Sequence, residues 1–359
     1  MNAQPTSSLD RAPQVNVSSY IRGTGMSVPD RVIPNSYFES YLETNDQWIR
    51  ERTGIIERRW AEPTMSMSDL ALPACERAIA SAGLTAADID GIVVATVTPD
   101  YVFPSTACVL QKKLGIRGSL AFDVNAVCSG FVYALVTAEG LVRSGAATNM
   151  LVVGADMFSR LIDPNDRTTA ILFGDGAGAM VLSAAGESNT APTGGPRVPV
   201  IGSPRTTRGI YGSQLHADGS HGDLLCVPGG TAAPVTPESL RDNKHYLTMN
   251  GREIFKLAVR GLAEVSDSLL KRHGMEVGDV DHYISHQANA RILTAVAKQL
   301  GLPVEKLALN VEKYGNTSAA RVPLLLAECV STGRVQQGDL VLISAFGAGL
   351  TWGAVLVRM

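Results

Sequence analysis

The sequence of 359 residues has no long apolar run and no marked excess of charge of either sign. No stretch approaches the ~20 apolar residues that a membrane-spanning helix needs, so we expect no membrane span. Lys and Arg number 31 against 34 Asp and Glu, a net charge of −3 that gives no field favouring nucleic acid or an anionic membrane. Only 18% of the residues are charged and the mean hydropathy is +0.10, whereas disordered chains show the opposite balance. These absences predict a folded protein with a large buried interior.

Cysteine pairs and metal-binding motifs are also missing. The five cysteines are dispersed and contain no C-x-x-C motif, which argues against a disulfide framework or a cysteine-rich zinc site and predicts the cytoplasm as the compartment. His282 and His286 lie four residues apart on a predicted strand, which would hold their rings ~13 Å apart, too far to share a metal. We therefore expect no metal site. The cysteines are Cys75, Cys108, Cys128, Cys226 and Cys329.

Helical and strand patterns alternate along the chain. Residues 1–14 are polar and lack the apolar core of a signal peptide, so we expect a disordered arm there. Apolar residues at helical spacing predict a helix over 68–82, and a continuous apolar run predicts a buried strand over 89–97. Strands separated by helices imply a mixed α/β fold in which helices cover the sheet. Further strands are expected at 150–153, 179–182, 280–285 and 340–344.

Segments of the first half recur in the second half. Residues 81–90 resemble residues 272–281, which are 191 positions later, and residues 145–153 resemble residues 335–343, which are 190 positions later. A third match, residues 114–116 with 300–302, has an offset of 186. Near-constant offsets predict two copies of one α/β unit. We expect halves at 15–185 and 245–359, separated by a loop-rich insertion at 186–244 that is rich in Gly, Pro, Thr and Ser.

Cys128 follows a short apolar strand and begins a helical pattern, in the segment D-V-N-A-V-C-S-G-F. A cysteine at a helix N-terminus lies at the positive end of the helix dipole, which favours the thiolate that acts as nucleophile. The alternative is a buried structural cysteine, the common fate of free cysteines and the interpretation we favour for Cys75, Cys108 and Cys329.

Two other segments carry candidate polar groups. His286, in H-Q-A-N-A-R, follows a strand and is a candidate acid–base or hydrogen-bonding group. Asn316, in G-N-T-S-A-A, lies two residues from the position that the offset of 186 makes equivalent to Cys128, so a pseudo-twofold axis would bring both elbows to one site. The alternatives are a surface or capping histidine and a turn asparagine.

A basic stripe is visible on two predicted helices. Arg252, Lys256 and Arg260 recur every four residues, and Arg291 and Lys298 are seven apart. Most such stripes are solvated helix faces. The functional alternative is a docking surface for an acidic partner.

Together, the segments around Cys128, His286 and Asn316 and the ending F-G-A-G-L-T-W-G resemble the β-ketoacyl-acyl-carrier-protein synthase III family of the thiolase superfamily. The resemblance runs from about Tyr20 to Met359 and includes T-N-D-Q-W-I-R-E-R-T-G-I, which begins at Thr44. It implies a thiolase-like α/β fold of five layers, α-β-α-β-α, built from two duplicated halves, and a homodimer.

The resemblance also assigns roles by matching positions. Cys128 matches the nucleophile that accepts the acyl group, and His286 and Asn316 match the residues that hold the malonyl thioester carbonyl. The backbone N–H groups of Cys128 and Ala348 match the oxyanion donors, although many members have glycine where Ala348 stands. Trp48, Arg52 and Arg167 match residues that bind CoA, and Phe103 matches a residue that reaches the acyl pocket of the partner subunit. The segment matched to carrier-protein docking comprises Gln287, Ala288, Asn289, Ala290 and Arg291. This match favours the docking interpretation of Arg252, Lys256 and Lys298.

The implied reaction is the decarboxylative condensation of an acyl-CoA with malonyl-acyl-carrier protein, which begins fatty-acid synthesis. Loss of CO₂ supplies the carbanion, so the resemblance implies no metal, redox cofactor or general base for that step. The nearest alternative is a sibling enzyme that primes a secondary metabolite such as a polyketide or quinolone. A Cys128-dependent thioester hydrolase and a non-catalytic acyl-binding protein are more distant alternatives.

Overall fold

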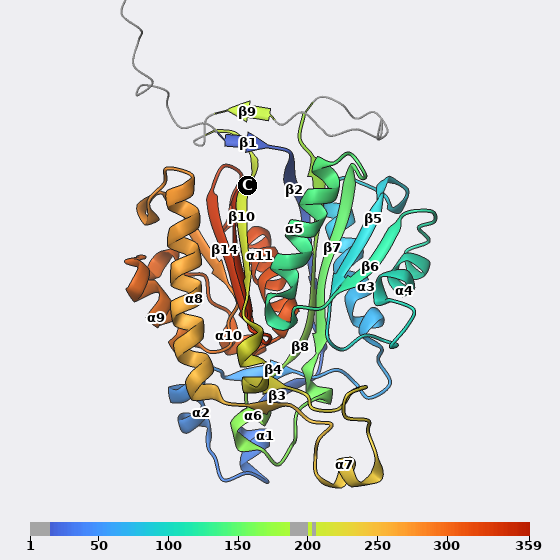
Figure 1. The fold of residues 1–359 in the computed structure, drawn as a ribbon, viewed down its shortest axis with the longest axis vertical. Helices are drawn as coiled ribbons and strands as arrows, with labels where there is room; N and C mark the ends of the chain where they lie inside the picture. Colours follow the sequence, from blue (N-terminus) through green and yellow to red (C-terminus); the bar gives the residue numbers. More distant parts are fainter. Residues whose placement is uncertain (1–14, 187–199, 203–205) are drawn as a thin grey trace, which may run out of the picture.

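The computed structural model describes residues 15–186, 200–202 and 206–359 (Figure 1). The predicted arm at 1–14 and part of the predicted insertion at 186–244 lie outside these residues. Within the described part of the chain, no helix is both long enough and apolar enough to cross a membrane.

Two mixed sheets form the framework, and their first four strands have the same arrangement; the first sheet has a fifth strand. In the first sheet the order is β2-β8-β7-β5-β6, with β8 antiparallel to both neighbours and β7, β5 and β6 parallel. In the second the order is β10-β15-β14-β13, with β15 antiparallel to both neighbours and β14 parallel to β13. The duplication read from the sequence is therefore a repeated topology. The strands are β2 (Ser19–Ser27), β5 (Gly91–Ala95), β6 (Leu120–Val124), β7 (Asn149–Met157), β8 (Asp175–Ala184), β10 (Gly209–Ala217), β13 (His282–Ser285), β14 (Leu340–Gly347) and β15 (Thr351–Arg358).

Helices fill the space between the sheets and cover both outer faces, which makes five layers (Figure 1). The central layer is α5 (Gly130–Arg143) with α11 (Arg321–Ser331); α3 (Met67–Ser81) and α4 (Thr106–Lys113) cover the first sheet. The second sheet is covered by α8 (Gly251–Arg272) and α9 (Ala290–Leu300). One apolar cluster occupies each gap between sheet and helices, and the largest joins both sheets through the central layer. The predicted thiolase-like α-β-α-β-α class is confirmed.

The apolar patterns explain these layers. Strands β5 and β14 are buried along their whole length because helices lie on both faces of their sheets, which is why both read as continuous apolar runs. Helix α8 is buried along one stripe and exposes Arg252, Lys256 and Arg260 on the other side.

The prediction of a loop-rich insertion over 186–244 is wrong for its middle part. Strand β10 lies within it and pairs with β15 from Gly209 to Ala217, which makes it an edge strand of the second sheet. It begins 190 residues after β2, so the second half begins at β10 rather than at residue 245. The strand was hard to recognise because two glycines and the polar residues Ser213, Gln214 and His216 interrupt its apolar pattern.

A smaller excursion follows β10 and returns to α8. It contains a two-stranded ribbon, β11 with β12, whose residues line the cavity described below. The antiparallel pair β3 with β4 and the short helices α1, α2, α6 and α7 lie at the lower end of the molecule in Figure 1. The short elements are β1 (Val15–Val17), β3 (Val32–Pro34), β4 (Glu57–Arg59), β9 (Val200–Gly202), β11 (Leu225–Cys226), β12 (Thr248–Met249), α1 (Ser36–Glu39), α2 (Asp46–Thr53), α6 (Arg167–Ala170), α7 (Pro237–Arg241) and α10 (Val311–Tyr314), with 3₁₀ turns η1 (Ala86–Asp88), η2 (Val127–Ser129), η3 (Phe158–Arg160), η4 (Gly219–Leu224), η5 (Val277–Asp279), η6 (Val304–Lys306) and η7 (Ser318–Ala320).

The two central helices begin at matching elbows. Turn η2 leads into α5 and turn η7 leads into α11, and the first residues of these turns, Val127 and Ser318, are 191 positions apart with φ of 48° and 50°. The elbows touch, since a Cβ added at Gly130 would lie 3.7 Å from the Cβ of Ala319. At this offset Ala319 is the counterpart of Cys128. The prediction that Asn316 occupies that elbow, made with an offset of 186, is therefore wrong by three residues.

Candidate active site

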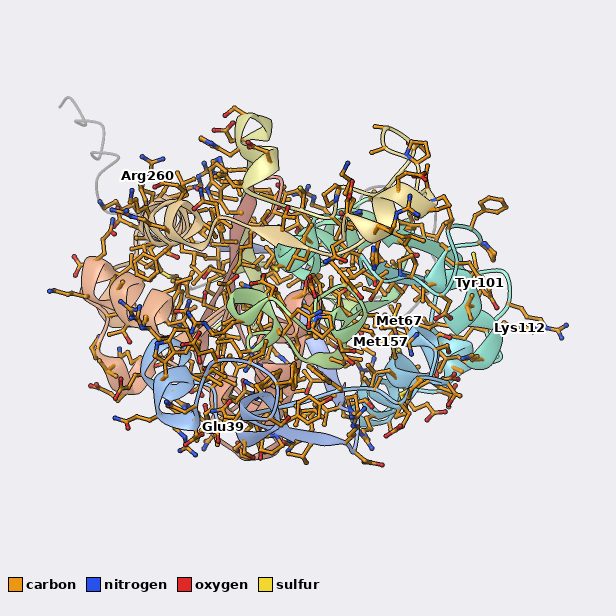
Figure 2. All side chains as sticks on the ribbon, turned by 90° about the horizontal axis from the view of Figure 1, so that it is seen from below. Glu39, Met67, Tyr101, Lys112, Met157 and Arg260 are labelled. Atoms are coloured by element: carbon orange, nitrogen blue, oxygen red, sulfur yellow. The ribbon has the colours of Figure 1, made fainter. Side chains whose placement is uncertain are left out.

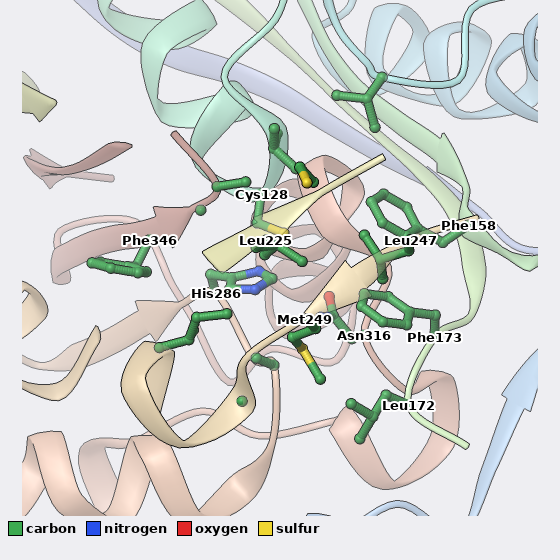
Figure 3. A pocket seen from close by; sticks show the side chains of 18 of the residues that line it. Cys128, Phe158, Leu172, Phe173, Leu225, Leu247, Met249, His286, Asn316 and Phe346 are labelled. Atoms are coloured by element: carbon green, nitrogen blue, oxygen red, sulfur yellow. The ribbon is translucent and has the colours of Figure 1, made fainter. Parts of the chain in front are cut away.

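Cys128, His286 and Asn316 line one cavity of about 460 Å³ between the halves (Figure 3). They come from the η2 elbow, the residue after β13, and the loop between α10 and η7. The sequence therefore placed in one site three residues that are 158 and 30 positions apart. Most of the remaining wall is apolar and includes Val97, Phe158, Leu161, Leu172, Phe173, Leu225, Val227, Leu247, Met249 and Phe346.

Cys128 lies at the entry to α5, as the pattern predicted, and is 4% exposed. The expectation that this position favours the thiolate is not met. Burial raises the pKa of the Cys128 thiol to about 12, and the nearby carboxylate of Asp156 acts in the same direction. The resting residue is therefore a neutral thiol, and the positive end of α5 is available to the charge that develops on sulfur during a reaction.

His286 is held as a neutral imidazole. Its backbone N–H donates to the Ser344 carbonyl at 2.9 Å, which fixes the residue at the end of β13 beside β14. Burial and the charge of Arg321 lower the pKa of His286 to about 3, against a small opposing effect of the Ser318 backbone. At neutral pH the ring is therefore uncharged and carries a single N–H donor.

Asn316 is fixed by its backbone and by its own side chain. Its N–H donates to the Leu172 carbonyl at 2.8 Å and its carbonyl accepts from the N–H of Gly174 at 3.0 Å. Its Oδ1 accepts the backbone N–H of Ser318 at 2.9 Å, so the Nδ2 amide is the group left to donate into the cavity. Asn316 and His286 thus present two neutral donors near the Cys128 thiol (Figure 3).

The end of β14 approaches the Cys128 elbow closely. A Cβ at Gly347 would lie 2.8 Å from the backbone nitrogens of both Cys128 and Ser129. Ala348, which lines the cavity, is tied to the elbow through Thr351, whose hydroxyl is 2.7 Å from the Ser129 hydroxyl and donates to the Ala348 carbonyl at 2.9 Å. The structure therefore brings both predicted oxyanion residues, Cys128 and Ala348, to one side of the cavity.

A second, more open cavity of about 600 Å³ joins the first through shared lining residues, among them Leu172, Met249 and Asn289. Trp48 and Arg52 line it. The guanidinium carbons of Arg167 and Arg52 lie 4.8 and 5.5 Å from the Trp48 ring centroid, so the three residues predicted to bind CoA form one cluster at the mouth.

The predicted docking segment is only partly at the surface. Arg291 and Lys298 are exposed on α9, and Arg252 and Lys256 line the second cavity together with Arg291. Ala288, Asn289 and Ala290 are half-buried, and Asn289 caps α9 by accepting from the N–H of Ile292.

Assigning Gln287 to carrier-protein docking was wrong. Gln287 has no exposed surface. Its side-chain amide donates to the Ala308 carbonyl at 2.7 Å, and its Oε1 accepts from the backbone N–H of Asn310 and from the Arg321 guanidinium. It serves the interior of the site. The sequence does not show whether a polar residue is exposed or buried when its hydrogen-bond partners lie far away in the chain.

Phe103 does not reach the cavity within one chain. It is 84% exposed, beside Val102 at 96% and Tyr101 at 60%. Figure 2 shows Tyr101 near Lys112 at one edge of the molecule, opposite Arg260. Three consecutive large apolar side chains so exposed are unusual in a monomer.

Two buried residues behind the cavity wall were missed by sequence reasoning. Asp156, fully buried in β7, accepts from the backbone N–H of Ala319 at 3.0 Å and of Val97 at 2.8 Å, and burial raises its pKa to about 6. Arg321 is also fully buried. The feature of the sequence that could have indicated it is a single cation directly before an apolar helical pattern. In the described ranges no three His, Cys, Asp or Glu side chains gather where they could hold a metal ion.

Comparison with known proteins gives a consistent assignment. Residues 122–193 match the family described as 3-oxoacyl-[acyl-carrier-protein (ACP)] synthase III, and residues 270–359 match its C-terminal part. A β-ketoacyl-[acyl-carrier-protein] synthase III of Alkalilimnicola ehrlichii is 46% identical over 344 residues, which cover 95% of this chain and 99% of the relative.

Solved structures of similar proteins lead to the same family assignment. The 3-oxoacyl-[acyl-carrier-protein] synthase III of Aquifex aeolicus is 41% identical with a TM-score of 0.83 over 95% of this chain and all of that one. The priming β-ketosynthase of the R1128 polyketide pathway is 31% identical, with a TM-score of 0.83 over 97% of this chain and 98% of that one. With this identity over nearly the whole length, the chain belongs to the β-ketoacyl-acyl-carrier-protein synthase III family of condensing enzymes.

Proposed function

We propose that this enzyme condenses an acyl-CoA primer with malonyl-acyl-carrier protein, through an acyl thioester on Cys128, to give 3-oxoacyl-carrier protein, CO₂ and free CoA. This reaction begins fatty-acid synthesis. The observation that supports the proposal most strongly is the convergence of Cys128, His286 and Asn316 on one mostly apolar cavity that opens to a cationic mouth.

The first half-reaction transfers the acyl group to sulfur. Cys128 attacks the thioester carbon, CoA leaves, and the thiol proton ends on the CoA sulfur. The carbonyl oxygen gains negative charge in the transition state, and the backbone N–H groups of Cys128 and Ala348 donate to it. Because Cys128 and His286 are both neutral before the reaction, the dipole of α5 assists the charge on sulfur only as it develops.

The second half-reaction makes a carbanion by loss of CO₂. The electron pair of the breaking C–C bond becomes an enolate, and the His286 N–H and the Asn316 Nδ2 amide donate to its oxygen. A neutral imidazole suits this role because it stabilises the enolate without protonating it outright. The carbanion then attacks the acyl-Cys128 carbonyl, and the Cys128 sulfur leaves as a thiolate that takes up a proton from solvent. Decarboxylation replaces proton abstraction, so this step needs no metal or redox cofactor.

The partners follow from the surface. We propose that the CoA moiety lies at the Trp48 cluster and that the acidic carrier protein docks on the exposed cations of α8 and α9. The exposed Tyr101, Val102 and Phe103 support a homodimer in which a second copy covers them and Phe103 completes the partner's acyl pocket. Cytoplasmic location, and the absence of nucleic-acid partners, stay predictions from composition.

The second candidate is a sibling enzyme that primes a secondary metabolite, which the likeness to the R1128 priming ketosynthase supports. A panel of acyl-CoAs with malonyl-carrier protein, read by product mass, tests both: a 3-oxoacyl product supports condensation, and the preferred acyl group separates the two candidates. Free acid and CoA without a condensed product would indicate a hydrolase instead. Cys128→Ser should abolish the acyl mass increment; condensation at the native rate in that variant would contradict the assigned nucleophile.

A further inference from the structure

Arg321 is a buried cation in a position where a cation is unfavourable. It has no exposed surface and is the first residue of α11, where the helix dipole presents its positive end. Burial lowers the pKa of Arg321 to about 10, which still leaves the guanidinium charged at neutral pH.

Its hydrogen bonds are to neutral groups only. Nη1 donates to the Gly315 carbonyl at 2.9 Å and Nη2 donates to Oε1 of Gln287 at 3.1 Å, while Nε has no partner. Among the described residues, no carboxylate lies within ion-pair distance of Arg321; Glu312 and Glu328 act on it from farther away. A buried charge without a close counter-ion is costly, so stability alone does not account for this residue.

The two acceptors lie directly beside the two enolate donors. Gly315 precedes Asn316, and Gln287 follows His286. Gln287 is itself fixed by bonds with Ala308 and Asn310, so the planar guanidinium links the His286 loop to the Asn316 loop with a rigid two-pronged contact.

We propose that Arg321 is a positioning residue that ties the His286 loop to the Asn316 loop and sets the spacing of the two donors on the enolate oxygen. The inference rests on the proposed function, since it is that reaction which requires both donors at one oxygen. Its charge also contributes to the lowered pKa of His286, which keeps the imidazole neutral.

The test compares Arg321→Met, Arg321→Lys and a control, Arg334→Met. Arg334 also donates to two acceptors, the backbone carbonyls of Glu305 and Leu307, but it is exposed and lies outside the cavity. Acylation of Cys128 by acyl-CoA is followed by mass, release of CO₂ from malonyl-carrier protein by isotope, and folding by thermal denaturation.

We expect Arg321→Met to acylate within about threefold of the wild type but to lose at least tenfold in kcat for decarboxylation, with KM nearly unchanged, because losing a donor's position weakens transition-state binding rather than ground-state binding. Arg321→Lys keeps the positive charge but lacks the planar two-pronged guanidinium, so its kcat for decarboxylation should fall less than that of Arg321→Met. Arg334→Met should match the wild type. Native decarboxylation in folded Arg321 variants, or equal loss of both half-reactions, would overturn the proposal. Should Arg321→Met not fold, Arg321→Lys decides by the same criteria.

A second readout does not depend on catalysis. In protein labelled at histidine, the His286 ring signals, identified by their loss in His286→Ala, are titrated by NMR. The His286 pKa should rise in Arg321→Met and stay low in Arg321→Lys. If the wild type catalysed neither half-reaction, the proposed function would be wrong. An unchanged His286 pKa in Arg321→Met would instead overturn the positioning role of Arg321.

Discussion

Gly347 offers a direct test of how the site would stabilise an oxyanion. A Cβ at this position would lie 2.8 Å from the nitrogens of Cys128 and Ser129 and 3.2 Å from the Ala126 carbonyl. An oxygen that accepts from the Cys128 N–H would lie at ~2.9 Å from the same nitrogen. The methyl group of Gly347→Ala would therefore crowd the backbone nitrogen that is proposed to donate to the oxyanion, and its neighbours are backbone atoms that cannot rotate away.

The expected size of the rate loss follows from the loss of one hydrogen-bond donor to the oxyanion. Removing an oxyanion donor slows acyl transfer by ~10²–10³, which corresponds to about 2.7–4 kcal/mol. We expect Gly347→Ala to slow acylation of Cys128 by this factor, measured as the growth of the acyl-enzyme mass under single-turnover conditions. Under the proposed mechanism decarboxylation depends on His286 and Asn316 instead, so its rate should fall less than the rate of acylation.

Gly140→Ala is the matched control. Gly140 lies in α5, the helix that follows Cys128, and an added Cβ there meets nothing within 4 Å. Alanine in a helix interior is favoured over glycine by ~0.5–1 kcal/mol, so this variant should be active and slightly more stable. A folded Gly347→Ala enzyme that acylates at the wild-type rate would refute the placement of the oxyanion at the Cys128 N–H.

Three further predictions address the other parts of the site. His286→Ala and Asn316→Ala should still acquire the acyl group, seen by mass, but lose malonyl decarboxylation; unchanged CO₂ release in both would exclude them as enolate donors. Because burial raises the pKa of the Cys128 thiol to about 12, its thiolate fraction grows tenfold per pH unit below that value, so alkylation of Cys128 by iodoacetamide should still be rising at pH 10. A plateau near pH 8 would show that the thiol ionises much more readily. Arg260→Glu with Lys298→Glu, which lie outside both cavities, should raise KM for malonyl-carrier protein and leave KM for acyl-CoA unchanged; an equal effect on both substrates would argue against docking on this face.

Local patterns predicted the elements that are buried on both faces or begin with a clear turn. The strands β5, β7 and β14 and the helix after Cys128 were recognisable because their apolar residues follow one period without interruption. Strand β10 was missed because its glycines and polar residues resemble a loop, and pairing with β15 is what makes it a strand. Its omission displaced the boundary of the second half.

The sequence alone determined the family and the duplicated α/β architecture, and it singled out Cys128, His286 and Asn316 as candidates, because each of these depends on a local motif or on a repeat along the chain. Tertiary contacts decided that Gln287 is buried, that Arg321 joins the two donor loops, and that the thiol and imidazole are both neutral. Those properties depend on the burial of a side chain and on partners far away in the chain. No local pattern encodes them, since the same residues would be exposed and hydrated in a different packing.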